Sequence, residues 1–540
     1  KVSPNTAAEG TIECKFWGLG GDGTVGANHN TIRILGDCAD MYAQAYFEYD
    51  SKKSFGVTKS HLRLSKKPIR STYYVKRADF VACHNQSYVR QYDMVQEVKP
   101  GGTFLLNTSW TPEELDANLP GKMKRYIAQN GIRLFTVDAV EVAQRVGLGS
   151  HINTVLQAAF FQIAGLMPVE EALDYMKDAA RKSYARKGDA VVAKNVAAID
   201  EGAQKCVEVA VPASWADAPL DESAAEADVP AVVENILRPV NAQKGDDLPV
   251  SAFAGYEDGV IDMGLTAYEK RGIAVKTPEW KAETCIQCNR CAFVCPHAAI
   301  RPYLLDQDEA QNAPEGFTTV ALKGGKNLPE GTRYAIQVSQ FDCTSCGSCA
   351  DVCPAGALDM QPAKLTDQAR KLWDYGLTIS DKDGAFDPYT VKGSQFKQPL
   401  LEFSAACAGC GETPYAKLLT QLFGDRVYWA NATGCSQAWG SPFPGIPYTV
   451  NKRGFGPAWT NSLFENNAEL SLGLFLGSVQ QRAVEKARVE KLSRALTHGL
   501  EKPKADAGDT PDAATMSAMK AACEDYLAAF DDFDASRNAA

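Results

Sequence analysis

The sequence predicts a multidomain α/β protein in which a doubly wound sheet domain precedes a smaller α+β domain. In the first part of the chain, β-prone segments alternate with helical ones, as in a sheet with helices on both faces. Further along, residues 285–296 and 343–354 repeat one spacing of four cysteines, C-x2-C-x2-C-x3-C-P. At 540 residues the chain has room for about three or four domains.

The elements of the first domain follow from hydrophobic periodicity and turn residues. Strands are expected at residues 11–17, 42–49, 80–83, 102–107 and 132–137, and helices at 113–129, 139–146, 147–161 and 190–199. Ligands of such sheets bind beyond the carboxyl ends of the strands. The segment 215–229 is rich in Ala, Asp, Glu and Pro and predicts a surface linker, and the charged residues 268–272 predict an exposed turn.

A glycine-rich turn, Gly18-Leu19-Gly20-Gly21-Asp22-Gly23-Thr24, follows the first expected strand. Glycine permits positive φ and close approach of the backbone to a ligand. A helix expected over 25–35 would aim its first amide groups at this turn, which suits a phosphate, although similar turns also close α/β units without a ligand. Lys52 stands beyond another strand, where a phosphate contact and a solvated basic turn remain equal alternatives.

The two cysteine runs predict two [4Fe–4S] clusters in a ferredoxin-like α+β domain. Three closely spaced thiolates bind one cluster, and the fourth, before a proline, ligates the other cluster of a two-cluster fold. Cys285, Cys288, Cys291 and Cys353 are therefore assigned to one cluster, and Cys343, Cys346, Cys349 and Cys295 to the second. Zinc sites use four ligands in two pairs, which fits this repeat less well. The insertion at 302–339 predicts an added hairpin or loop, and His297 a surface or hydrogen-bonding histidine.

A third C-x2-C pair, Cys407 and Cys410, is followed by Cys435 after a strand expected at 427–430. These three thiols are candidate ligands of a further cluster, with a zinc site as the alternative for the pair alone. A helix is expected to reach residue 476, and two more span 480–497 and 516–530 around a disordered segment, 502–514.

Composition limits the partners. Hydrophobic residues make up 45% and charged residues 23% of the chain, as in globular proteins generally. The net charge of −10 disfavours nucleic acid, and the lack of a run of eighteen apolar residues gives no membrane span. Cluster-binding thiolates and scattered thiols favour a reducing compartment. The first residue is lysine and no leader is recognisable, so we expect an internal piece of a longer protein.

In order and spacing these motifs resemble pyruvate:ferredoxin (flavodoxin) oxidoreductase. The matching segments are Phe16 to Ala27, Tyr49-Asp50-Ser51-Lys52-Lys53, Glu269-Lys270-Arg271, the two cysteine runs, Cys407-x-x-Cys410-Gly-Glu412, Gly434-Cys435-Ser436 and Trp459-x-Asn461-Ser-Leu-Phe-Glu465. The resemblance implies four regions: a Rossmann-like coenzyme A-binding domain at 1–212, a linker with an EKR-type segment at 213–281, a ferredoxin-like domain at 282–365 and a partial thiamine-diphosphate domain at 366–540.

The resemblance also implies the reaction and its cofactors. Pyruvate and coenzyme A would give acetyl-CoA and carbon dioxide, and two electrons would pass singly through three [4Fe–4S] clusters to ferredoxin or flavodoxin. Thiamine diphosphate with Mg²⁺ supplies the carbon chemistry. Coenzyme A contacts are implied at Gly20, Gly21, Asp22, Gly23, Thr24, Lys52, Asn153 and Asn195, and thiamine contacts at Glu412 and Cys435.

Parts of the resembling enzymes have no counterpart here. The fourth ligand of the third cluster, the Mg²⁺ site and the groups that handle pyruvate are implied to lie outside the chain, so the chain alone is expected to be inactive. A cytoplasmic or organellar homodimer is implied for the complete enzyme. The alternatives are another 2-oxoacid:ferredoxin oxidoreductase, a fused pyruvate:NADP+ oxidoreductase and, in a different class, a non-catalytic polyferredoxin.

Overall fold

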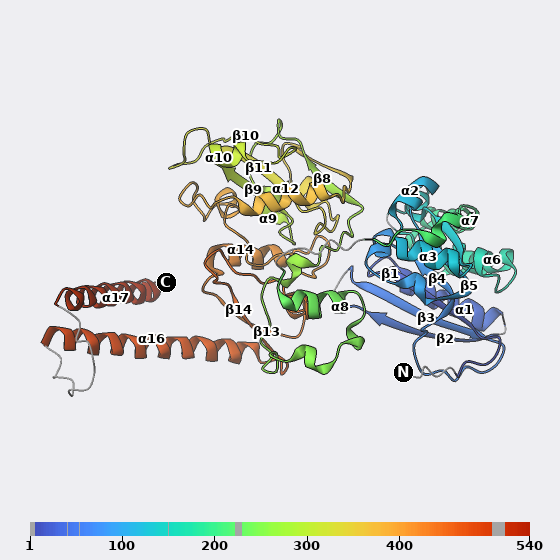
Figure 1. Cartoon of the computed structure of the whole chain (residues 1–540), viewed down its shortest axis with the longest axis horizontal. Helices are drawn as coiled ribbons and strands as arrows, with labels where there is room; N and C mark the ends of the chain where they lie inside the picture. Colours follow the sequence, from blue (N-terminus) through green and yellow to red (C-terminus); the bar gives the residue numbers. More distant parts are fainter. Residues whose placement is uncertain are drawn as a thin grey trace. The chain divides into compact units, whose positions relative to one another are not determined.

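The structure is a computed structural model that describes residues 6–39, 41–52, 55–149, 151–221, 229–498 and 513–539. It contains two compact units: residues 1–427 with 434–457, and residues 428–433 with 458–540 (Figure 1). Lys53, residues 222–228 of the predicted linker and residues 502–512 of the predicted disordered segment lie outside the described residues.

A seven-stranded mixed sheet forms the centre of the first domain. Its strands are β1 (Ile12–Leu19), β2 (Tyr42–Tyr49), β3 (Val57–Ser65), β4 (Ala78–Cys83), β5 (Val98–Asn107), β6 (Arg133–Val137) and β7 (Val207–Val209), in the order β2-β3-β1-β4-β5-β6-β7. Strands β1, β4, β5 and β6 are parallel, and the pairs β2–β3, β3–β1 and β6–β7 are antiparallel. The five strands predicted here are present, whereas β3 and β7 were not predicted.

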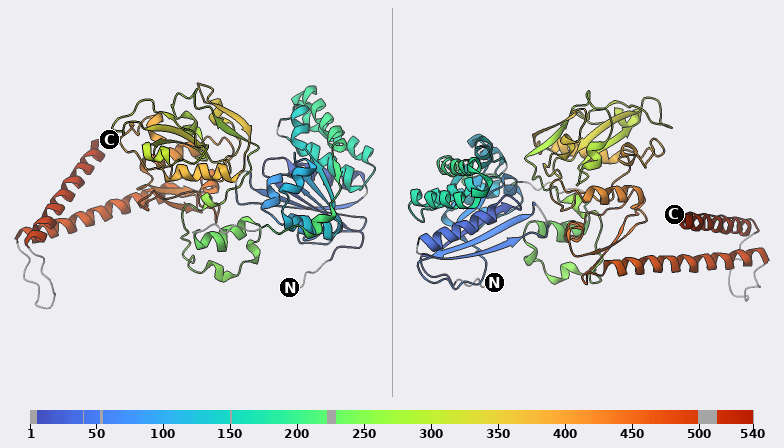
Figure 2. Two further views of the ribbon diagram at one scale, coloured as in Figure 1. Left: turned by 45° about the horizontal axis from the view of Figure 1, so that its top comes forward. Right: turned by 180° about the vertical axis from the view of Figure 1, so that it is seen from behind.

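Helices cover both faces of this sheet (Figure 2). One face packs against α1 (Thr24–Cys38), α4 (Ala139–Arg145), α5 (Asn153–Ala164), α6 (Val169–Tyr184) and α7 (Asp189–Gln204), and the other against α2 (Pro112–Asn118) and α3 (Gly121–Gln129). Because side chains alternate along a strand, Phe16 lies in the first core and Trp17 in the second. The predicted α/β layering is therefore present.

Two local predictions are wrong. The single helix expected at 113–129 is divided at Leu119 and Pro120, because a proline disfavours helical geometry in the residue before it. Trp215, predicted in a surface linker, is only 3% exposed and belongs to the second core. Its indole nitrogen donates to Asp116 at 2.8 Å. This contact joins residues far apart in the sequence, so the local composition could not predict it.

The cysteine runs lie between two antiparallel strand pairs. Strand β8 (Lys276–Trp280) precedes the first run and pairs with β12 (Leu358–Pro362), which follows the second. Strand β9 (Ile300–Leu305) follows the first run and pairs with β11 (Arg333–Val338), which precedes the second. The predicted hairpin in the insertion is confirmed by β9 and β11, with β10 (Val320–Ala321) at its edge.

The remainder of the first unit contains α12 (Asp367–Thr378), α14 (Thr413–Phe423) and α15 (Cys435–Gly440). The second unit contains the parallel pair β13 (Tyr428–Ala432) and β14 (Ala458–Ser462), then α16 (Asn467–His498) and α17 (Ala513–Ala539). The helices predicted at 480–497 and 516–530 lie within α16 and α17. No helix of the described part is long and apolar enough to span a membrane.

Candidate functional site

The two cysteine loops share one backbone conformation. In the first loop Gln287 and Asn289 have φ of 59° and 58°, and in the second Ser345 and Gly347, at the same two positions, have φ of 61° and 79°. These left-handed residues turn the chain twice between the first and third cysteine. The third cysteine of each loop is the second residue of a short helix. Cys291 lies in α9 (Arg290–Val294) and Cys349 in α11 (Ser348–Asp351).

The strand pairing brings the fourth cysteine of each run to the opposite loop. The thiol of Cys291 interacts with those of Cys285, Cys288 and Cys353, and burial together with these thiols raises its pKa to about 12. The second set shows the same grouping: the thiol of Cys343 interacts with Cys295 and Cys346, and burial and these neighbours likewise raise its pKa to about 12. Cys349 interacts with thiols of both sets, so the sets are neighbours.

Backbone amides also point at the sulfurs. The amides of Gln287 and Ser345 donate to Sγ of Cys285 and Cys343, each at 3.4 Å, and the amide of Ala357 donates to Sγ of Cys353 at 3.2 Å. Such donors stabilise thiolates and tune iron–sulfur clusters. Within the described ranges, no three His, Cys, Asp or Glu side chains are arranged to hold a single metal ion. Cluster binding by these sets therefore stays a prediction that the thiol groups fit chemically.

The third cysteine group lies beside the second set. Gly409, between Cys407 and Cys410, has φ of 68°, and a Cβ there would be 3.7 Å from Cβ of Cys346. The amide of Glu412 donates to Sγ of Cys410 at 3.4 Å.

Cys435, the other predicted ligand of this group, lies on a different element. It begins α15, and Trp439, one turn later, donates from its indole to the Glu412 carboxylate at 3.0 Å. This bond holds α15 beside Glu412, which follows Cys410 in the chain; that Cys435 joins Cys407 and Cys410 at one cluster stays a prediction.

His297 and Lys417 support the backbone around the fourth cysteine of the first run. His297, 3% exposed, bonds the Ser404 carbonyl through Nδ1 at 3.0 Å, so it is the predicted hydrogen-bonding histidine and not a surface one. Lys417 on α14 is 2% exposed, and its ammonium donates to the carbonyls of Ala292, Phe293 and Cys295. Burial lowers the pKa of Lys417 to about 8. In the sequence Lys417 is a single lysine within an amphipathic helical pattern, and nothing near it indicates a contact with these carbonyls. This role of Lys417 was therefore not predicted.

The glycine turn forms a shaped start to α1. The Asp22 carboxylate accepts from the amides of Leu19 and Thr24 at 2.9 and 2.7 Å. Gly23 caps the helix with φ of 86°, and a Cβ there would lie 2.8 Å from the Asn153 side chain. Gly23 and Asn153, far apart in sequence, are therefore adjacent, and their contact with coenzyme A stays a prediction.

Asn195 and Lys52 make internal contacts. Asn195, 3% exposed, donates to the Val191 carbonyl at 2.9 Å and lies 3.5 Å from the hydroxyl of Thr154, the neighbour of Asn153. The Lys52 side chain is only 7% exposed and pairs with Glu269 at 3.1 Å and Asp50 at 3.8 Å. The alternative of a solvated basic turn at Lys52 is therefore wrong.

The prediction of an exposed turn at 268–272 is also wrong. The Glu269 side chain is 4% exposed through its pair with Lys52. Lys270 pairs with Asp342 at 2.6 Å, and Arg271 donates to the Phe55 carbonyl. Charged residues are predicted to be exposed when their ion-pair partners are distant in the sequence, because the local pattern does not show those partners. This explains why an exposed turn was predicted.

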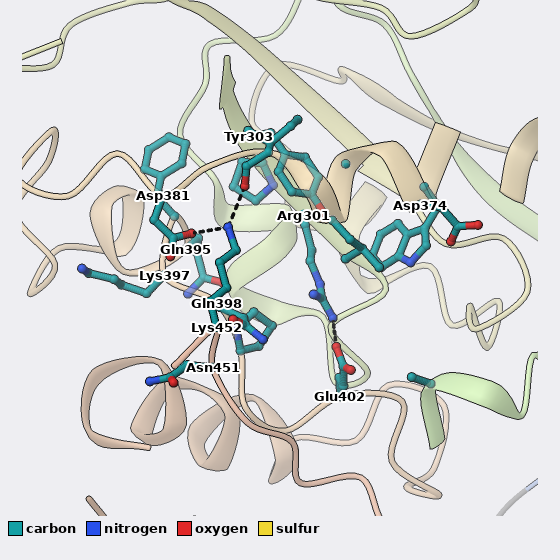
Figure 3. Close-up of a pocket in the computed structure, with 18 of the residues that line it drawn as sticks. Arg301, Tyr303, Asp374, Asp381, Gln395, Lys397, Gln398, Glu402, Asn451 and Lys452 are labelled. Carbon is teal, nitrogen blue, oxygen red and sulfur yellow. Dashed lines mark hydrogen bonds and ion pairs between the residues drawn. The ribbon is translucent and has the colours of Figure 1, made fainter. Parts of the chain in front are cut away.

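A cavity of about 510 Å³ lies elsewhere in the first unit (Figure 3). Arg301 and Glu402 form an ion pair in its wall, and Lys452 lies 3.4 Å from Asp381. None of the predicted site residues lines this cavity.

Comparisons with known proteins agree with this division. Residues 13–205 match the family described as pyruvate ferredoxin/flavodoxin oxidoreductase, residues 220–274 a domain of unknown function, and residues 284–358 a 4Fe-4S dicluster domain.

Over most of its length the chain is similar to curated relatives. Pyruvate:ferredoxin oxidoreductase of Moorella thermoacetica is 52% identical over 99% of this chain and 44% of that protein. Pyruvate-flavodoxin oxidoreductase of Enterobacter agglomerans is 49% identical over 99% and 44%. Pyruvate dehydrogenase [NADP(+)] of Cryptosporidium parvum is 47% identical over 87% and 26%. The chain thus spans less than half the length of each.

Proposed function

The chain belongs to the pyruvate:ferredoxin and pyruvate-flavodoxin oxidoreductase family, and we propose that it provides the coenzyme A site and the electron relay of such an enzyme. The complete reaction converts pyruvate and coenzyme A to acetyl-CoA and carbon dioxide. Two electrons leave, one at a time, for ferredoxin or flavodoxin. When bound, thiamine diphosphate with Mg²⁺ supplies the carbanion chemistry, and [4Fe–4S] clusters carry single electrons.

The observation that carries this proposal is the continuity of the three cysteine groups. Gly409 of the third group packs beside Cys346 of the second set, and Cys349 of the second set interacts with Cys291 of the first. A two-cluster carrier needs only two sets, whereas a third set beside Glu412 suits a relay that begins at a reaction centre. The order third group, second set, first set is then the direction of electron flow.

The first set lies next to a basic surface that suits an electron acceptor. Ile286, between Cys285 and Cys288, is 51% exposed. The Lys323 ammonium donates to the Cys285 carbonyl at 2.9 Å, and that of Lys392 donates to the Lys323 carbonyl at 2.8 Å. An exposed apolar residue beside lysines fits a carrier with an acidic docking face, because opposite charges steer association.

The glycine turn and its neighbours provide the proposed coenzyme A site. Amide groups at the start of α1, a helix of 15 residues, suit phosphate oxygens, and Lys52 is the predicted cation of the site. Gly20 to Thr24, Lys52, Asn153 and Asn195 are proposed as its contacts. Glu412 and Cys435 are proposed to face thiamine diphosphate, and Cys407, Cys410 and Cys435 to bind the third cluster.

Anaerobic reconstitution of the chain tests this function. We expect iron and acid-labile sulfide in equal amounts, at two complete clusters or more per chain, together with saturable coenzyme A binding by calorimetry and no pyruvate turnover by the chain alone. Stoichiometric zinc without sulfide would contradict the relay. Clusters without coenzyme A binding would favour the polyferredoxin alternative. Reduction of NADP+ by the full-length protein would favour the pyruvate:NADP+ alternative, to which the Cryptosporidium relative points.

A further inference from the structure

Glu269 and Lys52 form a buried ion pair. It joins the segment Glu269-Lys270-Arg271, called the EKR segment below, to the loop after β2. Glu269 lies in the region matched to a domain of unknown function. Its carboxylate is 3.1 Å from the Lys52 ammonium, and the two side chains are 4% and 7% exposed. Asn241, from the same region, donates to this carboxylate at 3.3 Å and lies 3.5 Å from the ammonium. Lys52 is thus enclosed by groups that this region provides.

The same segment supports the glycine turn. Arg271 donates to the carbonyl of Phe55. The amide of Phe55 donates to the Gly20 carbonyl at 3.2 Å, and the amide of Gly20 donates to the Gly56 carbonyl at 2.7 Å. A contact made by Arg271 is therefore transmitted by two backbone hydrogen bonds to the turn at the start of α1.

The charges around Lys52 are balanced. Lys52 and Arg271 supply two positive charges, and Asp50 and Glu269 supply two negative ones; Arg271 also interacts with Asp50. A phosphate that approaches Lys52 meets an ammonium already neutralised by carboxylates. If one of the two carboxylates loses its charge, the four side chains together carry a net positive charge. That net charge favours the binding of an anionic ligand.

We propose that the EKR segment is a working part of the coenzyme A site, in which Glu269 competes with a coenzyme A phosphate for Lys52. This inference rests on the proposed coenzyme A site. Glu269 is a positioning residue: it holds the Lys52 ammonium and sets how much of its charge a phosphate can use. The domain of unknown function thereby sets the affinity for coenzyme A, and Lys270, paired with Asp342 at 2.6 Å, fixes the segment on its other side.

Coenzyme A titration of the anaerobically reconstituted chain tests the competition. Glu269→Gln keeps the shape and the Asn241 contact but removes the charge, so we expect coenzyme A to bind about 10-fold more tightly. Glu269→Asp retains the charge and should stay near the wild-type dissociation constant. Glu97→Gln is the matched control, because Glu97 pairs with another buried lysine, Lys15, at 2.5 Å; its affinity should not change. Equal or weaker binding by Glu269→Gln overturns the inference.

A second measurement gives its main result without coenzyme A. An amine-specific reagent followed by peptide mass spectrometry reports how available Lys52 is in the folded chain. Labelling of Lys52 should rise several-fold in Glu269→Gln and not in Glu97→Gln, and added coenzyme A should suppress it. Unchanged labelling of Lys52 overturns the role of Glu269. Absence of coenzyme A binding in every variant, with increased labelling in Glu269→Gln, instead overturns the proposed coenzyme A site.

Discussion

The sheet domain and the two-cluster region are stabilised in different ways. In the sheet domain the rings of Phe16, Phe80 and Phe160 pack at centroid distances of 5.0 to 5.9 Å inside a large apolar core. In the two-cluster region, Cys285, Cys291 and Cys349 are themselves members of the core. We therefore expect the first region to be stabilised by apolar burial alone and the second to depend also on what its cysteines bind.

Buried polar side chains reinforce the contrast. Gln287 and Asn289, 1% and 2% exposed, lie inside the first cysteine loop. Gln287 bonds the Ala321 carbonyl and the Lys323 amide at 2.8 and 2.7 Å. A loop held by such bonds keeps its shape only while every partner is present. The two regions should therefore respond to different substitutions.

The largest effect is expected from the cysteines that cross between the loops. Cys353→Ala should abolish the cluster of the first loop and Cys295→Ala that of the second, because each provides the opposite set with its fourth thiolate. Iron and sulfide analysis with electron paramagnetic resonance of the reduced chain measures the loss. Cys38→Ala, at an exposed cysteine, should keep the full iron content. Loss of the cluster in the mutated cysteine's own loop would show that the sets do not cross.

A core substitution in the sheet domain should lower the stability of that domain and leave the iron content unchanged. Phe160 is 1% exposed, so Phe160→Ala should lower the free energy of unfolding of this domain by about 3–5 kcal/mol through the cavity it leaves. Denaturant titration followed by tryptophan fluorescence measures the change. Iron content of the folded protein should stay at the wild-type value, and a parallel loss of iron would contradict the independence of the two regions.

The sheet domain should also depend on pH through His84. Burial lowers the pKa of His84 to about 4 from 6.5, with Asp22 opposing this shift. The unfolded chain therefore binds more protons between these values, and the free energy of unfolding should rise by about 3 kcal/mol from pH 4 to 6.5 and then level. Thermal unfolding across this range checks the rise. His84→Asn should reduce it, and an unchanged profile would assign the rise to other groups.

The smallest effect concerns matched positions of the two loops. Asn289→Gly keeps the left-handed backbone but removes bonds to the Lys392 carbonyl and the Tyr334 hydroxyl, at 2.8 and 2.7 Å. It should cost about 2 kcal/mol, because the buried Tyr334 hydroxyl loses its acceptor. Gly347→Asn, the reverse change in the second loop, faces open space and should cost less than about 1 kcal/mol. Chemical denaturation of the reconstituted chain measures both, and equal costs would show that backbone geometry alone matters.

Local patterns predicted much of this protein. The alternation of strands and helices, the start of α1 after the glycine turn and the hairpin of β9 and β11 follow from periodicity and turn residues. The cysteine spacing predicted which thiols group together, because three ligands on one short loop leave the fourth position to a distant residue. The division of the helix at Pro120 was missed even though its signal is local.

Other features depend on residues far apart in the sequence. Lys52 with Glu269, Lys270 with Asp342 and Lys417 with the Cys295 carbonyl are buried contacts. A sequence read locally assigns such charges to the surface, because a buried charge is affordable only beside a partner that folding brings to it. Tertiary structure alone decided which lysines are enclosed, and hence that the EKR segment reaches the glycine turn.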